Sequence, residues 1–324
     1  MYESQSTSGV FRLLVFIAMV HTPICSVGAM AEHQHKGSEW MVSYRFMTMS
    51  MEDNRDGTDR LNNSEVLLSG SGNYLIAPTK MTMNMHMLGL MYAPSDAFAF
   101  MAMIPYIDND MDHVTAMGTQ FSTESSDLGD ISLSVISTNN RGFIWNLGIS
   151  FPTGSQDEED TTPMGRAVLP YPMQIGTGTY DLIAGVGYIV ERDKGSAGVQ
   201  IRGLFRIGEN DDGYRVGNQY ILTGWYSHRL SHHLSLSVHG LYEFKGNYSG
   251  KDLRYDMSQR MRVVPTVDEN LRGGQRFDLA LGINWLLTQE HRLTFEYKRP
   301  VWQNLDGPQL ETDRTLTLGW QKIF

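Results

Sequence analysis

The feature that most constrains the fold of this sequence is a repeated alternation of apolar and polar side chains. Residues 277–285 have the sequence Phe-Asp-Leu-Ala-Leu-Gly-Ile-Asn-Trp, and residues 315–321 have the sequence Thr-Leu-Thr-Leu-Gly-Trp-Gln. A period of two is typical of β-strands whose two faces meet different environments. Twelve segments of 9–15 residues follow this pattern: 39–51, 80–92, 97–107, 128–138, 143–151, 178–190, 196–208, 215–229, 233–245, 274–287, 291–299 and 313–324.

These segments are longer than ordinary strands, and their connections alternate in length. Soluble strands average about 5–6 residues, whereas a strand that crosses a membrane needs about 9–11. The short connections are 93–96, 139–142, 191–195, 230–232 and 288–290; the long ones are 52–79, 108–127, 152–177, 246–273 and 300–312, with 209–214 the shortest of that set. Short turns on one rim and long loops on the other are typical of outer-membrane barrels, and an even strand number places both termini on the periplasmic rim.

Composition argues against two other classes, helical membrane proteins and nucleic-acid-binding proteins. Hydrophobic residues make up 41% of the chain, mean hydropathy is -0.29, and the longest apolar run extends from Leu13 to Val20. A transmembrane helix needs about 20 such residues, so a helical membrane protein is excluded. The net charge of -10 disfavours a nucleic-acid partner. We therefore predict an all-β fold, a closed antiparallel transmembrane β-barrel of about 12 strands with short periplasmic turns and long extracellular loops; a secreted β-sandwich is the alternative.

The first residues indicate export. Arg12 precedes the apolar run, and Ala29-Met30-Ala31 fits a small-x-small cleavage site, which predicts a signal peptide over 1–31. A short His-containing segment, 32–38, would then precede a barrel over 39–324. Cleavage would also remove Cys25, the single cysteine, so that the mature chain has no disulfide and no thiolate metal site. The predicted location is the bacterial outer membrane.

Aromatic residues concentrate near the ends of the predicted strands, as in the interfacial girdles of membrane proteins. They are Tyr92, Phe98, Tyr106, Phe143, Tyr188, Tyr226, Tyr242, Trp285, Tyr297, Trp320 and Phe324. The terminal Phe324 resembles the targeting signal that the barrel-assembly machinery recognises in bacterial outer-membrane proteins. The expected partners are therefore this machinery, outer-membrane lipid and lipopolysaccharide, and a small-molecule solute.

Two short motifs narrow the class further. Asp127-Leu128-Gly129-Asp130 opens a predicted strand, and Phe151-Pro152-Thr153-Gly154 closes the next one. Together with the terminal strand, these motifs resemble the outer-membrane "transporter" family named for the meta-pathway of phenol degradation, over roughly 39–324. The resemblance implies a barrel that admits small hydrophobic or aromatic compounds. It carries over no binding residues.

Methionine is concentrated in the first three predicted strands. Thirteen of the 17 methionines that follow the signal lie between 41 and 117, at alternate positions. On the first strand they share a face with Arg45, and an Arg facing lipid at mid-membrane would cost about 2–4 kcal/mol. That face should therefore be luminal. The candidate ligand-binding patch is Met47, Met49, Met83, Met85, Met87, Met101 and Met103.

Three roles for this patch remain open. Thioether side chains adapt to varied shapes and contact aromatic rings, which suits an apolar ligand track. They also select Cu(I), for which His33, His35, His86, Met83 and Met85 are the metal-ligand candidates. The third role is simple wall filling. A luminal Met face places Thr82, Asn84 and His86 outward, unless a β-bulge reverses that part of the strand.

Charged residues also fall on predicted inward positions. The candidate luminal charge network is Arg45, Arg202, Arg206, Glu243, Asp278 and Glu296, with His239, Lys245 and Lys298 at similar positions. Because both signs are mixed, we expect ion pairs that narrow the lumen and not a strong ion selectivity. The acidic run 157–160 falls in an extracellular loop, where it is either solvated or binds cations.

We find no motif for catalysis, neither a phosphate loop, a zinc motif nor a nucleophile elbow, and we predict that the protein is not an enzyme. The predicted function is an outer-membrane channel or transporter-like barrel that binds or passes small hydrophobic or aromatic solutes, without a cofactor. The alternatives are soft-metal (copper) binding or transport through a Met-lined lumen, and a non-transporting structural or adhesion barrel.

Overall fold

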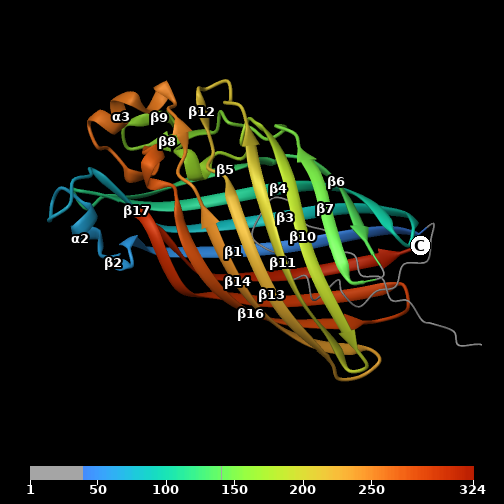
Figure 1. Ribbon diagram of the computed structural model, residues 1–324. Coiled ribbons are helices and arrows are strands. Elements are labelled where there is room, and N and C mark those ends of the chain that lie inside the picture. The colour runs from blue at the N-terminus through green and yellow to red at the C-terminus, as the bar shows by residue number, and fades with distance from the viewer. Residues whose placement is uncertain (1–38, 140) are drawn as a thin grey trace, which may run out of the picture.

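The computed structural model describes residues 39–139 and 141–324 and shows one β-barrel (Figure 1). The predicted signal peptide, the segment 32–38, His33 and His35 lie outside the described residues. Among the described residues, no helix is long and apolar enough to cross a membrane.

Eleven antiparallel strands form a closed ring, in which neighbours in the chain are neighbours in the sheet and β17 returns to β1. They are β1 (Glu39–Gly57), β3 (Ile76–Ser95), β4 (Phe98–Thr115), β6 (Ser132–Thr138), β7 (Phe143–Ser150), β10 (Tyr180–Arg192), β11 (Gly195–Ile207), β13 (Gln219–Arg229), β14 (Leu234–Lys245), β16 (Gly274–Leu286) and β17 (His291–Ile323). Two further strands, β2 (Asp59–Leu61) and β5 (Gln120–Leu128), join the sheet outside this ring.

The long strand β17 folds back on itself. Residues 292–305 pair with β16, and residues 305–323 pair with β1. The two arms are joined by Gln303 and Thr312, since the Gln303 amide donates to the Thr312 carbonyl at 2.9 Å and accepts from its N–H at 3.0 Å. The wall is therefore crossed twelve times, and the predicted closed barrel of about 12 strands is confirmed.

The connections follow the expected asymmetry. Tight turns lie on the rim where the chain ends, and the long connections gather at the other end of the barrel (Figure 1). Those long connections contain α2 (Asn63–Val66), β8 (Glu159–Thr162), β9 (Gly165–Val168), η1 (Tyr171–Met173), β12 (Tyr214–Arg215), β15 (Ser249–Gly250), η2 (Leu253–Tyr255), α3 (Asp256–Arg260), η3 (Pro265–Val267) and η4 (Glu269–Leu271).

Several strands extend further than the alternation predicted. β1, β3 and β4 have 19, 20 and 18 residues, and the expected loop 108–127 is the end of β4 and most of β5. Most of the expected loop 300–312 is likewise strand, within β17. These extensions reach beyond the apolar belt, where the outward face of β4 becomes polar at Asp108 and Asp110. The alternation with apolar side chains outward therefore ends, although the backbone pairing continues.

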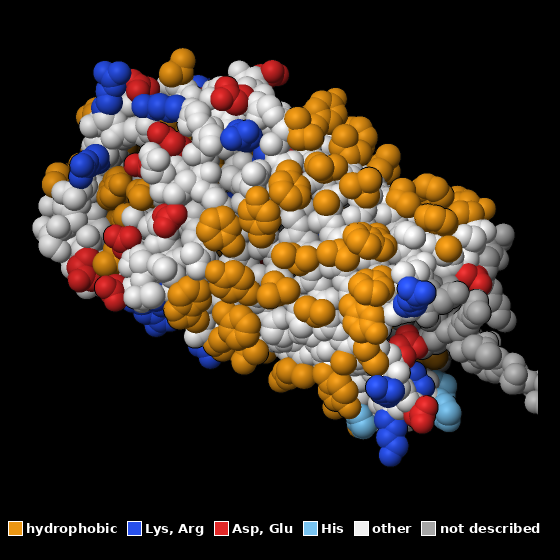
Figure 2. All heavy atoms as spheres, viewed as in Figure 1, with side chains coloured by type: hydrophobic (Ala, Val, Ile, Leu, Met, Phe, Trp, Pro, Cys, Tyr) orange, Lys and Arg blue, Asp and Glu red, His pale blue; other side chains and the backbone are white. Residues whose placement is uncertain are grey.

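The outer surface of the barrel carries an apolar belt. Figure 2 shows hydrophobic side chains across the middle of the visible face, with charged groups beyond both edges of this region. Rings pair near the short-turn rim: Trp40 and Tyr92 are stacked with ring centres 4.5 Å apart, and Phe143 and Tyr188 are tilted with ring centres 5.0 Å apart. Because lipid offers no hydrogen-bond partners, the closed sheet satisfies its backbone groups internally while the belt faces hydrocarbon.

Candidate functional site: a luminal cavity

The methionines of β1, β3 and β4 lie opposite one another across the sheet, on its inner face. The register pairs Met47 with Met85, Met49 with Met83 and Met51 with Met81. It continues onto β4, where Met111 lies opposite Met81 and Met101 opposite Met91. Because residues of equal parity point to one side of a strand, this register builds a continuous thioether surface inside the barrel.

This surface belongs to two packed clusters that meet at Met83. The cluster nearer the short-turn rim includes Met47, Met85 and Met103, together with Trp225 from the opposite side of the ring. The cluster nearer the long loops contains Met81 and Met111, on which Met173 of η1 packs. The lumen is therefore filled by methionine toward the periplasmic rim and covered by a loop above.

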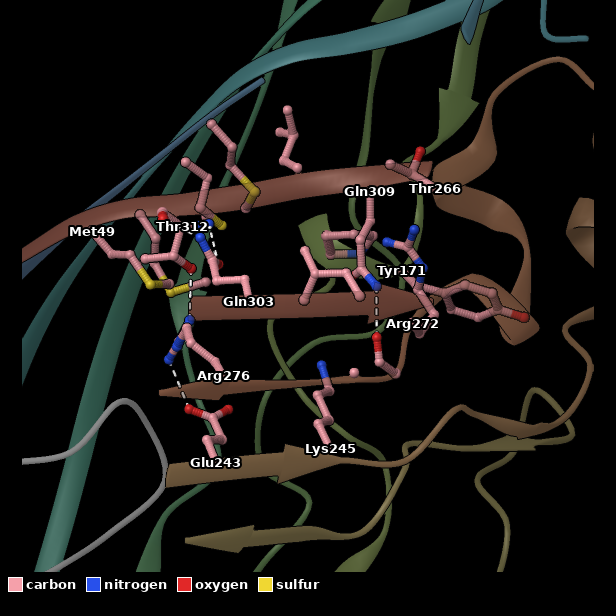
Figure 3. Close-up of a pocket in the computed structure, with 18 of the residues that line it drawn as sticks. Met49, Tyr171, Glu243, Lys245, Thr266, Arg272, Arg276, Gln303, Gln309 and Thr312 are labelled. Carbon is pink, nitrogen blue, oxygen red and sulfur yellow. Dashed lines mark hydrogen bonds and ion pairs between the residues drawn. The ribbon is translucent and has the colours of Figure 1, made fainter. Parts of the chain in front are cut away.

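Between the methionine surface and the opposite wall lies a cavity of about 330 Å³ (Figure 3). One side of it consists of thioether side chains, which are Met49, Met51, Met81, Met83 and Met111. The other side is polar and charged, from β14, β16 and β17. Apolar lining with a few placed polar groups is the usual character of a small-molecule site.

Four charged residues form a chain of ion pairs on the polar side. Arg276 contacts Glu243 at 2.7 Å and Asp278 at 3.0 Å, and Asp278 lies 3.6 Å from Lys298. Glu243 also accepts from the Gln219 amide at 2.7 Å. Because each carboxylate faces at least one cation, the desolvation cost of these buried charges is partly offset.

Two other basic residues reach the cavity without such a partner. Among the described residues, neither Lys245 nor Arg272 makes an ion pair with a carboxylate. The Lys245 ammonium lies 5.5 Å from the centre of the Tyr248 ring. Arg272 is 6% exposed, its Nε has no hydrogen-bond partner, and its Nη2 is 3.5 Å from the Pro265 carbonyl. Burial lowers the pKa of Arg272 to about 10, so that the guanidinium remains charged at neutral pH.

The cavity is covered by a cluster of tyrosines from the long loops. Tyr171 of η1 lies edge-on to Tyr214, Tyr248 and Tyr255, with ring centres 4.9–5.0 Å apart. Burial raises the pKa of the Tyr171, Tyr214 and Tyr255 hydroxyls, so that they stay protonated. Tyr255 uses its hydroxyl to donate to the Leu169 carbonyl, which joins two different loops.

One carboxylate fixes both ends of the loop that carries this cover. Asp130 accepts from the Gly154 N–H at 2.9 Å, and from the Thr177 N–H at 2.9 Å and hydroxyl at 2.8 Å. Thr153 adds a hydrogen bond to the Gly129 carbonyl at 2.9 Å. The two motifs noted in the sequence, at 127–130 and 151–154, are therefore in direct contact. Together they hold η1 over the cavity.

The predicted patch divides between the cavity and the core beneath it. Met49 and Met83 line the cavity, whereas Met47, Met85, Met87, Met101 and Met103 are buried in the cluster nearer the periplasmic rim. No bulge reverses β3 within 80–92, so Thr82, Asn84 and His86 do face outward. His86 accordingly contacts the Tyr44 hydroxyl at 2.7 Å, on the face opposite to Met83 and Met85.

This placement separates the proposed copper ligands. His86 cannot share an ion with Met83 or Met85, because the sheet lies between them. Among the described residues, no group of three His, Cys, Asp or Glu side chains is arranged to hold a metal. Within the cavity the described residues bring several thioethers together, and His86 is not among its lining.

The predicted charge network is distributed over more than one site. Glu243 and Asp278 join the chain of ion pairs around Arg276, whereas Arg206 pairs with Asp181 on a neighbouring part of the wall. Other members are buried on the inner face, and these are Arg45, Arg202 and Glu296.

Sequence reasoning missed several cavity residues. Met51, Met81, Met111 and Arg276 have the parity of residues already selected, so strict use of the alternation would have included them. Arg272, Tyr171 and Tyr248 lie outside the barrel strands, and no periodic signal marks them.

Comparison with known proteins places the chain in a wider group. The family model described as "Putative MetA-pathway of phenol degradation" matches residues 68–302. Among solved structures, the COG4313 outer membrane channel from Pseudomonas putida F1 aligns with a TM-score of 0.59 at 14% identity, over 90% of this chain and 96% of that one. A deltaS2 mutant of the TodX monoaromatic hydrocarbon channel aligns with a TM-score of 0.50 at 10% identity, over 92% and 93%. Among curated protein sequences, none is detectably similar to this chain.

Proposed function

The chain belongs to the family whose model matches residues 68–302, and from that membership and the luminal cavity we propose an outer-membrane channel for small hydrophobic or aromatic solutes. The observation that carries the proposal is the methionine wall of the cavity. Methionine has a flexible, polarizable side chain that fits varied apolar shapes and contacts aromatic rings favourably.

The size of the cavity agrees with this solute class. An apolar cavity of about 150 Å³ holds benzene, so about 330 Å³ has room for a substituted single ring. A solute that leaves the cavity toward the periplasmic rim meets buried Met47, Met85 and Met103. Passage therefore requires their side chains to change rotamer, which unbranched methionine does at low cost.

The barrel and its apolar belt support an outer-membrane location. We further propose that residues 1–31 are a cleaved signal peptide and that lipopolysaccharide surrounds the polar ends of β1, β3 and β4. Phe324 is exposed, and its N–H donates to the Trp40 carbonyl at 2.8 Å. An accessible terminal aromatic suits recognition by the barrel-assembly machinery.

No chemical step is needed for this function, and we propose none. Copper is a second candidate because thioethers of Met49, Met81, Met83 and Met111 line one cavity. Soft thioether ligands select Cu(I). A structural or adhesion role would make no use of this cavity.

Blocking the cavity tests the channel. Met83→Trp places a bulky ring into it, and Met117→Trp, in the exposed turn between β4 and β5, is the matched control, since Met117 is 91% exposed. Cells that produce equal amounts of heat-modifiable barrel should take up labelled toluene several-fold more slowly with Met83→Trp, and at the parent rate with Met117→Trp. Uptake by the parent no faster than by barrel-free cells would contradict the proposal.

A further inference from the structure

The charge of the cavity differs from that of the whole chain. Its lining contains three basic residues, Lys245, Arg272 and Arg276, and one acidic residue, Glu243, a net of +2 in a protein of net charge -10. Glu243 and Arg276 neutralise each other at 2.7 Å. Lys245 and Arg272 remain as charges that the lining itself does not compensate.

Most of the uncharged polar groups of the lining are already engaged, although the buried Thr266 hydroxyl has no hydrogen-bond partner among the described residues. Gln303 bonds to Thr312 in both directions, and Gln309 donates to the Gly273 carbonyl at 2.6 Å. Gln219 donates to Glu243, and Gln174 donates to the Leu169 carbonyl at 2.7 Å. A ligand rich in hydroxyl groups would therefore find few free partners. The charged groups that remain available are the two cations.

Arg272 is buried and, among the described residues, no carboxylate lies within ion-pair distance of it, so a bound anion would reduce the cost of burying this charge. Figure 3 shows Lys245 rising from β14 into the cavity and Arg272 beside the Tyr171 ring. The methionine side chains lie across the cavity from Lys245. The cavity thus offers an apolar surface suited to a ring and, facing it, positive charge suited to a carboxylate.

We propose that the preferred solute is a monocyclic aromatic carboxylate, its ring on the methionine wall and its carboxylate at Arg272 and Lys245. This inference rests on the proposed channel function and specifies its substrate class. Guanidinium supplies paired donors in the geometry that a carboxylate accepts. A small inorganic anion would make no favourable contact with the thioether wall, so we do not propose such an anion as the ligand.

The test compares benzoate with benzamide, its uncharged analogue of the same shape, and with toluene. Binding to the purified full-length mature barrel in detergent is measured by equilibrium dialysis at neutral pH. We expect benzoate to bind about tenfold or more tightly than benzamide, the range for a hydrogen bond to a charged group. Arg272→Gln and Lys245→Gln should each reduce this preference several-fold and leave toluene binding unchanged.

The matched control is Arg260→Gln. It removes one positive charge from the same extracellular loop region, but Arg260 is 74% exposed, pairs with Asp256 and lies outside the cavity lining. The preference for benzoate should survive this change. Equal binding of benzoate and benzamide, or an undiminished preference in Arg272→Gln, would overturn the inference and leave the channel proposal standing.

Two further outcomes complete the test. Inorganic sulfate that displaces benzoate at similar concentration would reduce the site to a simple anion site and overturn the role of the methionine wall. Failure of all three aromatic compounds to bind would refute the inference and the channel proposal together.

Discussion

Asp130 should stabilise the closed loop that covers the cavity without affecting the stability of the barrel strands. Its carboxylate accepts three hydrogen bonds, from Gly154 and Thr177, at the two ends of the loop that carries Tyr171. At about 1.5 kcal/mol each, the low end for bonds to a charged group, they stabilise the closed loop by about 4.5 kcal/mol. Asp130→Ala should therefore raise the opening equilibrium of the loop roughly a thousandfold.

Amide hydrogen exchange at Gly154 and Thr177 measures this opening directly. In Asp130→Ala both amides should lose protection, while amides of β13 and β14, which lie elsewhere in the ring, should exchange as in the parent. Asp130→Asn retains one acceptor oxygen, so it should have an intermediate effect.

The control lies in the same short motif. Asp127 is exposed, and within residues 39–139 and 141–324 the hydrogen bond of its carboxylate is to the N–H of the next residue, Leu128, at 2.7 Å. Asp127→Asn should leave the loop protected. Unchanged exchange at Gly154 and Thr177 in Asp130→Ala would show that the tyrosine cluster alone holds the loop, and the reasoning would be wrong.

Four further predictions concern the lumen, the chain end and the topology. Arg276→Met leaves Glu243 without its ion-pair partner and Asp278 with Lys298 alone, and should lower the free energy of unfolding by about 3 kcal/mol, measured by urea titration in detergent; an unchanged midpoint would contradict the ion-pair description. Replacement of the cavity methionines by Leu should lower the free energy of unfolding by less than about 1.5 kcal/mol per site and preserve the barrel. Any Cu(I) binding by the parent, measured by competition with a chelating dye, should be lost. The positions are Met49, Met51, Met81, Met83 and Met111. Deletion of Phe324 should reduce the yield of heat-modifiable barrel, and a normal yield would contradict this expectation. A tag within 246–273 should be labelled on intact cells and one within 139–142 should not, so that labelling at 139–142 would contradict the topology.

The barrel could be predicted well from the sequence because every strand that crosses the lipid must present apolar side chains on its outer face. Alternation places Met47 and Met85 on the inner face and His86 on the outer face, as the structure has them. The alternation failed to predict the strand extensions that lie beyond the lipid-facing belt. Beyond the apolar belt the outward face of β4 is polar, as at Asp108 and Asp110, while Met111 stays buried on the inner face, and backbone pairing with β3 and β5 defines the strand.

The candidate site could be predicted only in part for a related reason. Met49, Met83 and Glu243 lie on barrel strands, so parity located them. Arg272 and Tyr171 lie in long loops and reach the cavity through contacts between distant segments. The link between Asp130 and Thr177 depends on a folded loop, which no local pattern encodes.

The pairing of Met41 with Ile323 has a consequence for assembly. Every other neighbouring pair of strands in the ring is joined by one turn or loop, but this contact closes almost the whole chain. The entropic contribution to the free energy of that closure is about 5 kcal/mol, against about 1 kcal/mol for a four-residue turn. Until the last arm of β17 arrives, β1 presents an unpaired edge that hydrocarbon cannot satisfy. A growing sheet therefore needs a temporary partner for β1, and a chain that stops early has no stable place in the bilayer.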